Sequence, residues 1–234
     1  MEKRTLAIML AILFAFAILL AILLGPKPDP HYAYLQAVKD AARNDSSSIV
    51  RTLIPIDDAN TQLIRDSDGK VLFATWTSWG GYDSMEGKEM NLSVEVWVAV
   101  GHQLRDFCTA LPEDGWALRT EQEMGLPPGK NKTRFVEMFV NPRDIFRPCA
   151  DSEINDAECG FSFPEGTTAE YRAWFLSLQS RSYGENGYPW TRLGYTYDWG
   201  SASHVGLSEY VVKPGSEIRI AGVYASGEYC AKAS

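Results

Sequence analysis

Aromatic side chains are concentrated between positions 188 and 199 of this chain. Five of these twelve residues are Tyr or Trp, namely Tyr188, Trp190, Tyr195, Tyr197 and Trp199. Arg192 lies among them. Exposed aromatic rings present flat apolar faces with polar edges, so they stack on sugars or anchor a protein partner. The sequence therefore predicts a ligand-binding segment made of the five aromatic residues and Arg192.

The same spacing has a second interpretation. Tyr195, Tyr197 and Trp199 are separated by two residues, which is typical of the inward face of a β-strand. Gly-rich stretches at 184–187 and 200–203 predict loops on both sides, so part of the segment would be exposed. Both interpretations stay open at the level of the sequence.

Acidic residues are the obvious candidates for a metal site. Asp151, Glu153, Asp156 and Glu158 lie close together, and calcium takes about six to eight oxygen ligands. The stretch lacks the Gly and the alternating Asp residues of an EF-hand, however. Zinc sites commonly pair cysteines roughly two to four residues apart, and no such pair occurs here. We expect a solvated acidic loop, no metal and no other cofactor.

Catalytic motifs are equally weak. Serine hydrolysis needs a nucleophile, a base and an orienting acid, and the candidates are Ser201, Ser203 and Ser208 with His204 and His102. No Gly-x-Ser-x-Gly elbow is present. The pattern predicts no catalytic residue. A pair of carboxylates, as in glycosidases, stays an alternative because its spacing in space is invisible in a sequence.

All four cysteines lie well beyond the apolar run at 6–24, and an even number fits two disulfides. Four cysteines allow three pairings. We prefer Cys149 with Cys159, which closes a short acidic loop, and Cys108 with Cys230, which ties the C-terminus to the middle of the domain. Disulfides persist in oxidising compartments, so this prediction implies export.

An apolar run near the start predicts a membrane anchor. Residues 6–24 are nineteen consecutive apolar residues, and a helix of that length nearly spans the roughly 30 Å hydrocarbon core. Lys3 and Arg4 precede the run, which favours a cytoplasmic N-terminus. We expect a cytoplasmic stretch at 1–5, a signal anchor in the lipid bilayer at 6–24, a Pro-rich spacer at 25–30 and an extracytoplasmic domain at 31–234. A cleaved, secreted form is the alternative.

The amino-acid composition and the net charge restrict the class of protein and the kind of partner. Apolar residues make up 45% and charged residues 22% of the 234 positions, which is typical of a folded domain rather than a disordered chain. The net charge is −8, without a basic stripe. Phosphate groups would be repelled, so we expect no nucleic-acid partner.

Hydrophobic periodicity indicates strands interleaved with short helices. Helices are expected at 31–43, 103–111, 117–124, 143–146 and 171–181. Strands are expected at 49–56, 61–65, 71–77, 92–100, 134–140, 208–212 and 217–224. The predicted fold class is α+β: an N-terminal transmembrane helix followed by one mixed, mainly antiparallel β domain with short helices.

Several motifs are similar to those of one family of uncharacterised exported or membrane-anchored bacterial proteins. They are Val94-Glu-Val-Trp-Val98, Asp106-Phe-Cys108, Phe146-Arg-Pro-Cys149 with Glu153-Ile154, Asp156 and Cys159, the stretch from Pro189 to Trp199, Ser208-Glu-Tyr-Val-Val212 and Glu228-Tyr-Cys230. They extend over most of the domain, and His102 departs from the Pro expected in that family. The resemblance implies a bacterial envelope location and structural cysteines, and it implies no activity.

Together these features predict a membrane-tethered domain of the cell envelope that binds another protein or takes part in an envelope assembly. The alternative is an envelope hydrolase or a carbohydrate-binding domain that uses the 188–199 segment. A deep cleft holding the aromatic face and two carboxylates within about 10 Å would favour the enzyme. A flat, exposed apolar patch would favour the protein-binding domain.

Overall fold

The structure is a computed structural model that describes residues 12–14, 16, 29–112, 114–130, 132–184 and 186–231. Its strands are β1 (Val71–Thr77), β2 (Glu89–Asn91), β3 (Val96–Val100), β4 (Arg134–Val140), β5 (Ile145–Phe146), β6 (Tyr195–Tyr197), β7 (Val205–Val212) and β8 (Glu217–Ala225). Its helices are α2 (Pro30–Ala41), α3 (Gly101–Thr109), α4 (Trp116–Glu123), α5 (Ala169–Ser182) and α6 (Ser226–Tyr229). Three single turns of 3-10 helix are η1 (Ser46–Ser48), η2 (Gly80–Tyr82) and η3 (Pro142–Asp144).

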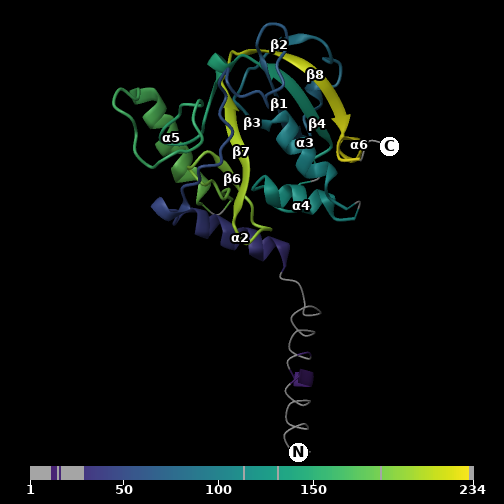
Figure 1. Ribbon diagram of the computed structural model, residues 1–234, viewed down its shortest axis with the longest axis vertical. Coiled ribbons are helices and arrows are strands. Elements are labelled where there is room, and N and C mark those ends of the chain that lie inside the picture. Colours follow the sequence, from purple (N-terminus) through teal and green to yellow (C-terminus); the bar gives the residue numbers. More distant parts are fainter. Residues whose placement is uncertain are drawn as a thin grey trace, which may run out of the picture.

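The strands form one antiparallel sheet in the order β2-β8-β4-β1-β3-β7-β5, and β6 pairs with β7 beside it. In Figure 1 α5 lies on one side of β7, α3 and α4 lie on the other, and α2 runs beneath β6. The mainly antiparallel sheet with short helices confirms that part of the predicted fold class.

One face of the sheet carries the main apolar core. Phe73, Val98, Met138, Tyr210 and Ile220 are all buried there. Cross-strand partners point to the same face, and the register pairs Val98 with Tyr210 and Met138 with both Phe73 and Ile220. The ring of Phe73 meets that of Tyr210 edge to face, with 5.5 Å between the centroids. The alternation of buried residues along β8 thus has a direct packing cause, whereas the central strands β1 and β4 are buried on both faces.

A different row of side chains crosses the opposite face. Glu209 on β7 lies opposite Ala99 on β3, Ala99 lies opposite Ala74 on β1, and Ala74 lies opposite Glu137 on β4. The row therefore places two small alanines between two glutamates. Over the Glu137 end, Tyr229 of α6 packs on this face with apolar residues of α3. The Glu209 end is roofed by the segment around β6.

Helix α2 forms within two residues of the bounds expected at 31–43. Asp29 accepts a hydrogen bond from the backbone N–H of His31 at 3.0 Å, and Pro30 occupies the first helical turn, where its missing N–H costs nothing. Tyr34, Ala37, Val38 and Ala41 follow helical spacing and pack against Tyr197 and Trp199. The helix therefore holds the aromatic segment from below.

Strands expected at 49–56 and 61–65 are wrong. The backbone N–H groups of Leu53 and Ile56 donate to Ala157 and Ile154, at 3.0 and 2.6 Å. Pro55 between them has no N–H, which prevents a continuous ladder. This stretch therefore lines the disulfide loop as irregular chain. Most other expected elements form within a few residues of their predicted bounds, although 143–146 is a 3-10 turn followed by β5.

The predicted transmembrane helix at 6–24 needs a correction. No helix in the described part of the chain has the length and apolar character that a bilayer crossing requires. Only residues 12–14 and 16 of the apolar run belong to that part; the rest of the run, residues 1–5 and most of the 25–30 spacer lie outside it. For the described residues, the fold class that the structure supports is the antiparallel sheet domain with short helices.

Both cysteine pairs form the predicted disulfides. Cys108, in α3, bonds Cys230 after α6 with 5.0 Å between their Cα atoms, and Cys149 bonds Cys159 with 6.5 Å between theirs. Two disulfides indicate an oxidising, extracytoplasmic environment, because reducing compartments keep thiols free. The first links the helical cover of the sheet to the chain end, and the second closes the acidic loop.

We expect the two disulfides to stabilise the domain unequally. The Cys108–Cys230 bridge spans 122 positions and the other spans 10. By loop entropy, replacing both members of each pair by Ser should cost about 5 and about 3 kcal/mol of unfolding free energy, respectively. Urea unfolding of the two double variants measures this difference. Free thiols in the native protein under non-reducing mass spectrometry would contradict the pairing.

Candidate functional site

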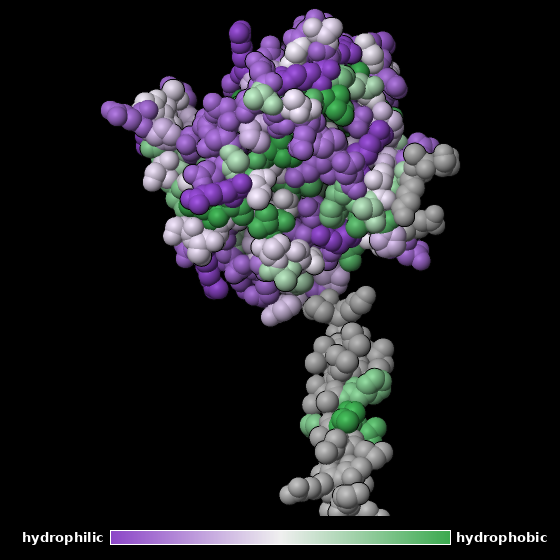
Figure 2. Space-filling model, in the orientation of Figure 1, coloured by the Kyte–Doolittle hydropathy of each residue, from purple (hydrophilic) through white to green (hydrophobic). Residues whose placement is uncertain are grey.

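A cavity of about 370 Å³ lies between the sheet and the aromatic segment. Its floor is formed by β3 and the end of β1, including Trp76, Trp97 and Ala99, and its roof includes Tyr188, Trp190 and the β6 residues. Met124, Leu126, Leu178 and Pro189 add apolar wall. Figure 2 shows a mostly hydrophilic surface on which apolar side chains gather in small patches across the middle of the domain.

The sheet register explains the hollow. Ala99 lies opposite both Ala74 and Glu209, so small side chains stand where larger ones would fill the space. Trp97 and Trp76, two positions along their strands, are large and form a wall. On the roof, Gly125 has φ +63°, and a Cβ there would lie 3.3 Å from the carbonyl oxygen of Tyr197. A glycine is therefore required for this close approach.

Glu209 is the carboxylate in the cavity wall. Among the described residues, no group forms a hydrogen bond or ion pair with its carboxyl, and burial raises its pKa to about 8. The other glutamate of the same row is different: Glu137 accepts hydrogen bonds from Tyr229 (3.1 Å) and Tyr224 (3.3 Å) and lies 3.7 Å from Arg105. The carboxyl of Glu137 is thus hydrogen-bonded within the domain, whereas Glu209, at the other end of the row, faces the cavity.

Lys132 is the cation in the cavity wall. Its ammonium donates to the backbone carbonyl of Trp76 at 2.9 Å. Burial, and then the nearby charge of Lys130, hold its pKa below the usual range for lysine. The ion pairs of the described residues do not include one between Lys132 and Glu209.

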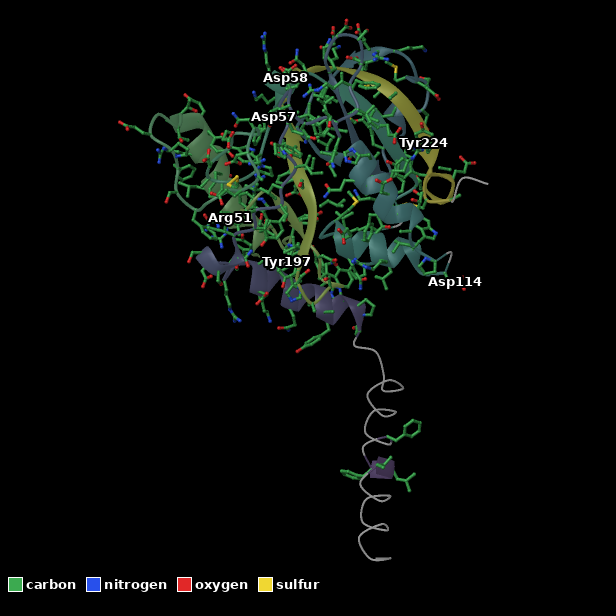
Figure 3. All side chains as sticks on the ribbon, in the orientation of Figure 1. Arg51, Asp57, Asp58, Asp114, Tyr197 and Tyr224 are labelled. Carbon is green, nitrogen blue, oxygen red and sulfur yellow. A yellow bond between two sulfur atoms is a disulfide. The ribbon has the colours of Figure 1, made fainter. Side chains whose placement is uncertain are left out.

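Four of the six side chains predicted to bind a ligand line this cavity: Tyr188, Trp190, Tyr195 and Tyr197. Tyr188 is 50% exposed and lies at the rim, whereas the other three are at most 5% exposed. Their polar atoms are used internally, since Trp190 donates to Pro148, Tyr195 to Ser48 and Tyr197 to Asp40. Figure 3 shows Tyr197 just above α2 and Tyr224 far from it, near α6.

Arg192 and Trp199 lie outside the cavity wall. Arg192 donates to the carbonyls of Ala41, Ala42 and Asn44, where a cation complements the end of α2. Trp199 meets the ring of Tyr34 edge to face and donates to the carbonyl of Leu126 at 3.0 Å. Both residues hold the roof in place. The inward-facing interpretation therefore describes the packing of most of the segment.

Sequence reasoning missed Glu209, Lys132, Trp76 and Trp97. One signal was present: Glu209 and Val211 share a face of the strand expected at 208–212, so a charged residue stood beside an apolar one on the same face. The sequence did not indicate Lys132, because this residue lies in the loop before β4 and its position depends on the path of that loop.

A second group of charges fixes the roof to α4. Arg119 donates to both carboxylate oxygens of Asp198, at 2.9 and 2.6 Å, and to Glu123 at 3.0 Å. Burial, and then the neighbouring Asp198, raise the pKa of Glu123 to about 8. Every member of this group has a partner, so we assign it a structural role.

The other candidate constellations are not assembled. Asp156 pairs with the buried Arg147 and Glu158 pairs with Arg51, each at 2.7 Å. No group of three or more His, Cys, Asp or Glu residues in the described ranges could hold a metal ion. The Nδ1 atom of His204 contacts the carbonyl of Asp198 at 3.1 Å, and the Ser203 hydroxyl lies 3.0 Å from that of Ser201. These contacts do not form a Ser–His pair.

We expect Glu209→Gln to flatten the pH dependence of stability. An unfolded glutamate has a pKa of about 4.3, below the value of about 8 in the fold. The stability from its bound proton is complete below about pH 4.3 and is lost as the pH rises through about 8. Between about pH 5 and 8 the natural protein should therefore lose unfolding free energy faster than the variant, by up to about 1.4 kcal/mol per pH unit.

Urea unfolding at several pH values measures these slopes. The control is Glu217→Gln, which changes an exposed glutamate of β8 and should keep the natural slope. Glu123 titrates in every variant, so its contribution cancels. Equal slopes for Glu209→Gln and the natural protein would contradict the burial of this carboxyl.

No family model, curated protein or solved structure matches this chain. The resemblance to exported bacterial proteins therefore stays a prediction, and any function must be argued from the cavity itself.

Proposed function

We propose that this chain is a non-enzymatic binding domain of an extracytoplasmic compartment, and that its cavity receives an apolar group of a ligand or a partner protein. The observation that carries the proposal is an aromatic-walled cavity with one carboxyl group that lacks a partner among the described residues. Ligand sites are typically apolar hollows with a few polar groups that fix orientation.

Size supports a small occupant. Binding cavities commonly measure about 300 to 1,000 Å³, and this one, at about 370 Å³, lies at the small end. It would hold a side chain or a compact small molecule. A protein partner would therefore insert one residue here, and the surrounding surface would supply the remaining contact.

The geometry gives the hydrolase alternative less support. A glycosidase needs two carboxylates about 5 to 10 Å apart. Glu209 is the one acidic residue among the described residues of the cavity wall. Glu137 shares its row but lies three strands away, roughly 14 Å at the usual strand spacing, and is bonded elsewhere. Sugar stacking also needs open ring faces, and in the 188–199 segment Tyr188 alone is strongly exposed.

We expect Tyr188→Ala to weaken binding without weakening the fold. 2-Phenylethanol is a neutral probe that fits a small aromatic cavity, and loss of one aromatic contact should lower its affinity about 3- to 10-fold. An NMR shift titration measures the affinity. Tyr188 is half exposed, so thermal unfolding should change little.

Tyr32→Ala is the matched control, because Tyr32 is a similarly exposed tyrosine, on α2, and it does not line the cavity. It should leave the affinity for 2-phenylethanol unchanged. Equal losses in the two variants, or no saturable binding by the natural protein, would contradict the proposed function.

A further inference from the structure

We propose that the group received by this cavity is an organic cation: an ammonium on an apolar body that pairs with Glu209 between the rings of Trp97, Trp190 and Tyr188. The inference rests on the proposed function, since it names the chemistry of the ligand for the same cavity. A free amine and a lysine side chain of a partner share this chemistry.

The first argument is the missing counter-charge. The fully buried acids in the described part of the chain have polar partners: Glu121 accepts from two backbone N–H groups, Glu123 and Asp198 bind Arg119, and Glu137 binds two tyrosines. Glu209 has no such partner there. Glu209 is half-buried in a mostly apolar cavity wall, and an ionised carboxylate there costs free energy unless a cation or hydrogen-bond donors compensate it. An incoming ammonium would supply this compensation.

The second argument is the aromatic wall. Trp97, Trp190 and Tyr188 line the same cavity as Glu209. The negative faces of aromatic rings attract cations, most strongly for Trp and most strongly where water is excluded. Rings together with a carboxylate are therefore a better match to an ammonium than to a neutral or anionic group.

The other titratable groups of the cavity do not supply the counter-charge. Lys132 directs its ammonium to the Trp76 carbonyl, and the hydroxyls of Tyr195 and Tyr197 are bonded to Ser48 and Asp40. Tyr188 is at the rim. Helix α3, which packs on the same sheet face, and the 124–126 roof add no described charged residue to the wall.

Binding should then be linked to proton release. Burial raises the pKa of Glu209 to about 8, so the free site is mostly protonated at pH 6. A cation pairs with the ionised form, so its affinity should rise about ten-fold per pH unit between about pH 6 and 8. A neutral ligand of the same shape should show no such rise.

The experiment compares phenethylamine with 2-phenylethanol by NMR titration at about pH 6, 7 and 8, where the amine stays protonated. The amine should gain affinity about ten-fold per unit and the alcohol should change less than two-fold. N-acetyl-lysine amide forms a third arm: tighter binding than phenethylamine would assign the cation to a partner's lysine, and weaker binding would assign it to a free amine.

Glu209→Gln should remove the pH dependence and leave the affinity for the alcohol, while Glu217→Gln should keep both. Lys132→Met should raise the affinity for the amine, because a like charge leaves the cavity. Binding of the alcohol without any preference for the amine at pH 8 would overturn the cation inference and leave the proposed function standing. Failure of both probes would overturn both.

Discussion

A carboxyl group on an apolar sheet face is the feature around which the rest of this domain is arranged. Glu209 and Glu137 occupy one cross-strand row with Ala99 and Ala74 between them. Around Glu137 the chain supplies two tyrosine hydroxyls and Arg105, and a disulfide fixes α3 to the segment after α6 that carries this cover. Around Glu209 it supplies aromatic rings and an empty volume. The two glutamates of the row thus differ: Glu137 is bonded within the domain, and Glu209 lines a cavity where we propose that a ligand binds.

Much of the fold could be predicted from local patterns. Strands β1 and β4 form at their expected bounds, and α2 and α5 begin at Asp29 and Thr168, whose side chains accept from backbone N–H groups. The disulfide pairing that we preferred among the three possible ones also forms. The strand expected at 49–56 was wrong, because the backbone N–H groups on either side of Pro55 donate to isolated carbonyls of a distant loop and not to a neighbouring strand. The expectation of a transmembrane helix at 6–24 was corrected, because no helix in the described part of the chain is long and apolar enough to cross a bilayer.

The site was harder to predict, because it depends on the register between paired strands and on the path that the loops take between distant strands. The aromatic segment was recognisable, yet its composition could not show that Tyr188 lies at the rim while Trp190 and Tyr197 are buried. Arg192 looked like a ligand contact and instead binds carbonyls at the end of α2. Glu209 left a trace, as a charge in an inward position of a strand. The space that Ala99 leaves beside Glu209 can be recognised only when the pairing of β3 with β7 is known.

The ionisation of Glu209 in the free protein is the most direct test of this account. An NMR titration of its side-chain carboxyl carbon reports the pKa of this one group, with Glu209→Gln identifying the resonance. The account predicts a midpoint near 8, because the half-buried carboxyl is partly desolvated in an apolar cavity wall and has no counter-charge among the described residues. A midpoint near 4, the ordinary value for an exposed or ion-paired glutamate, would contradict it.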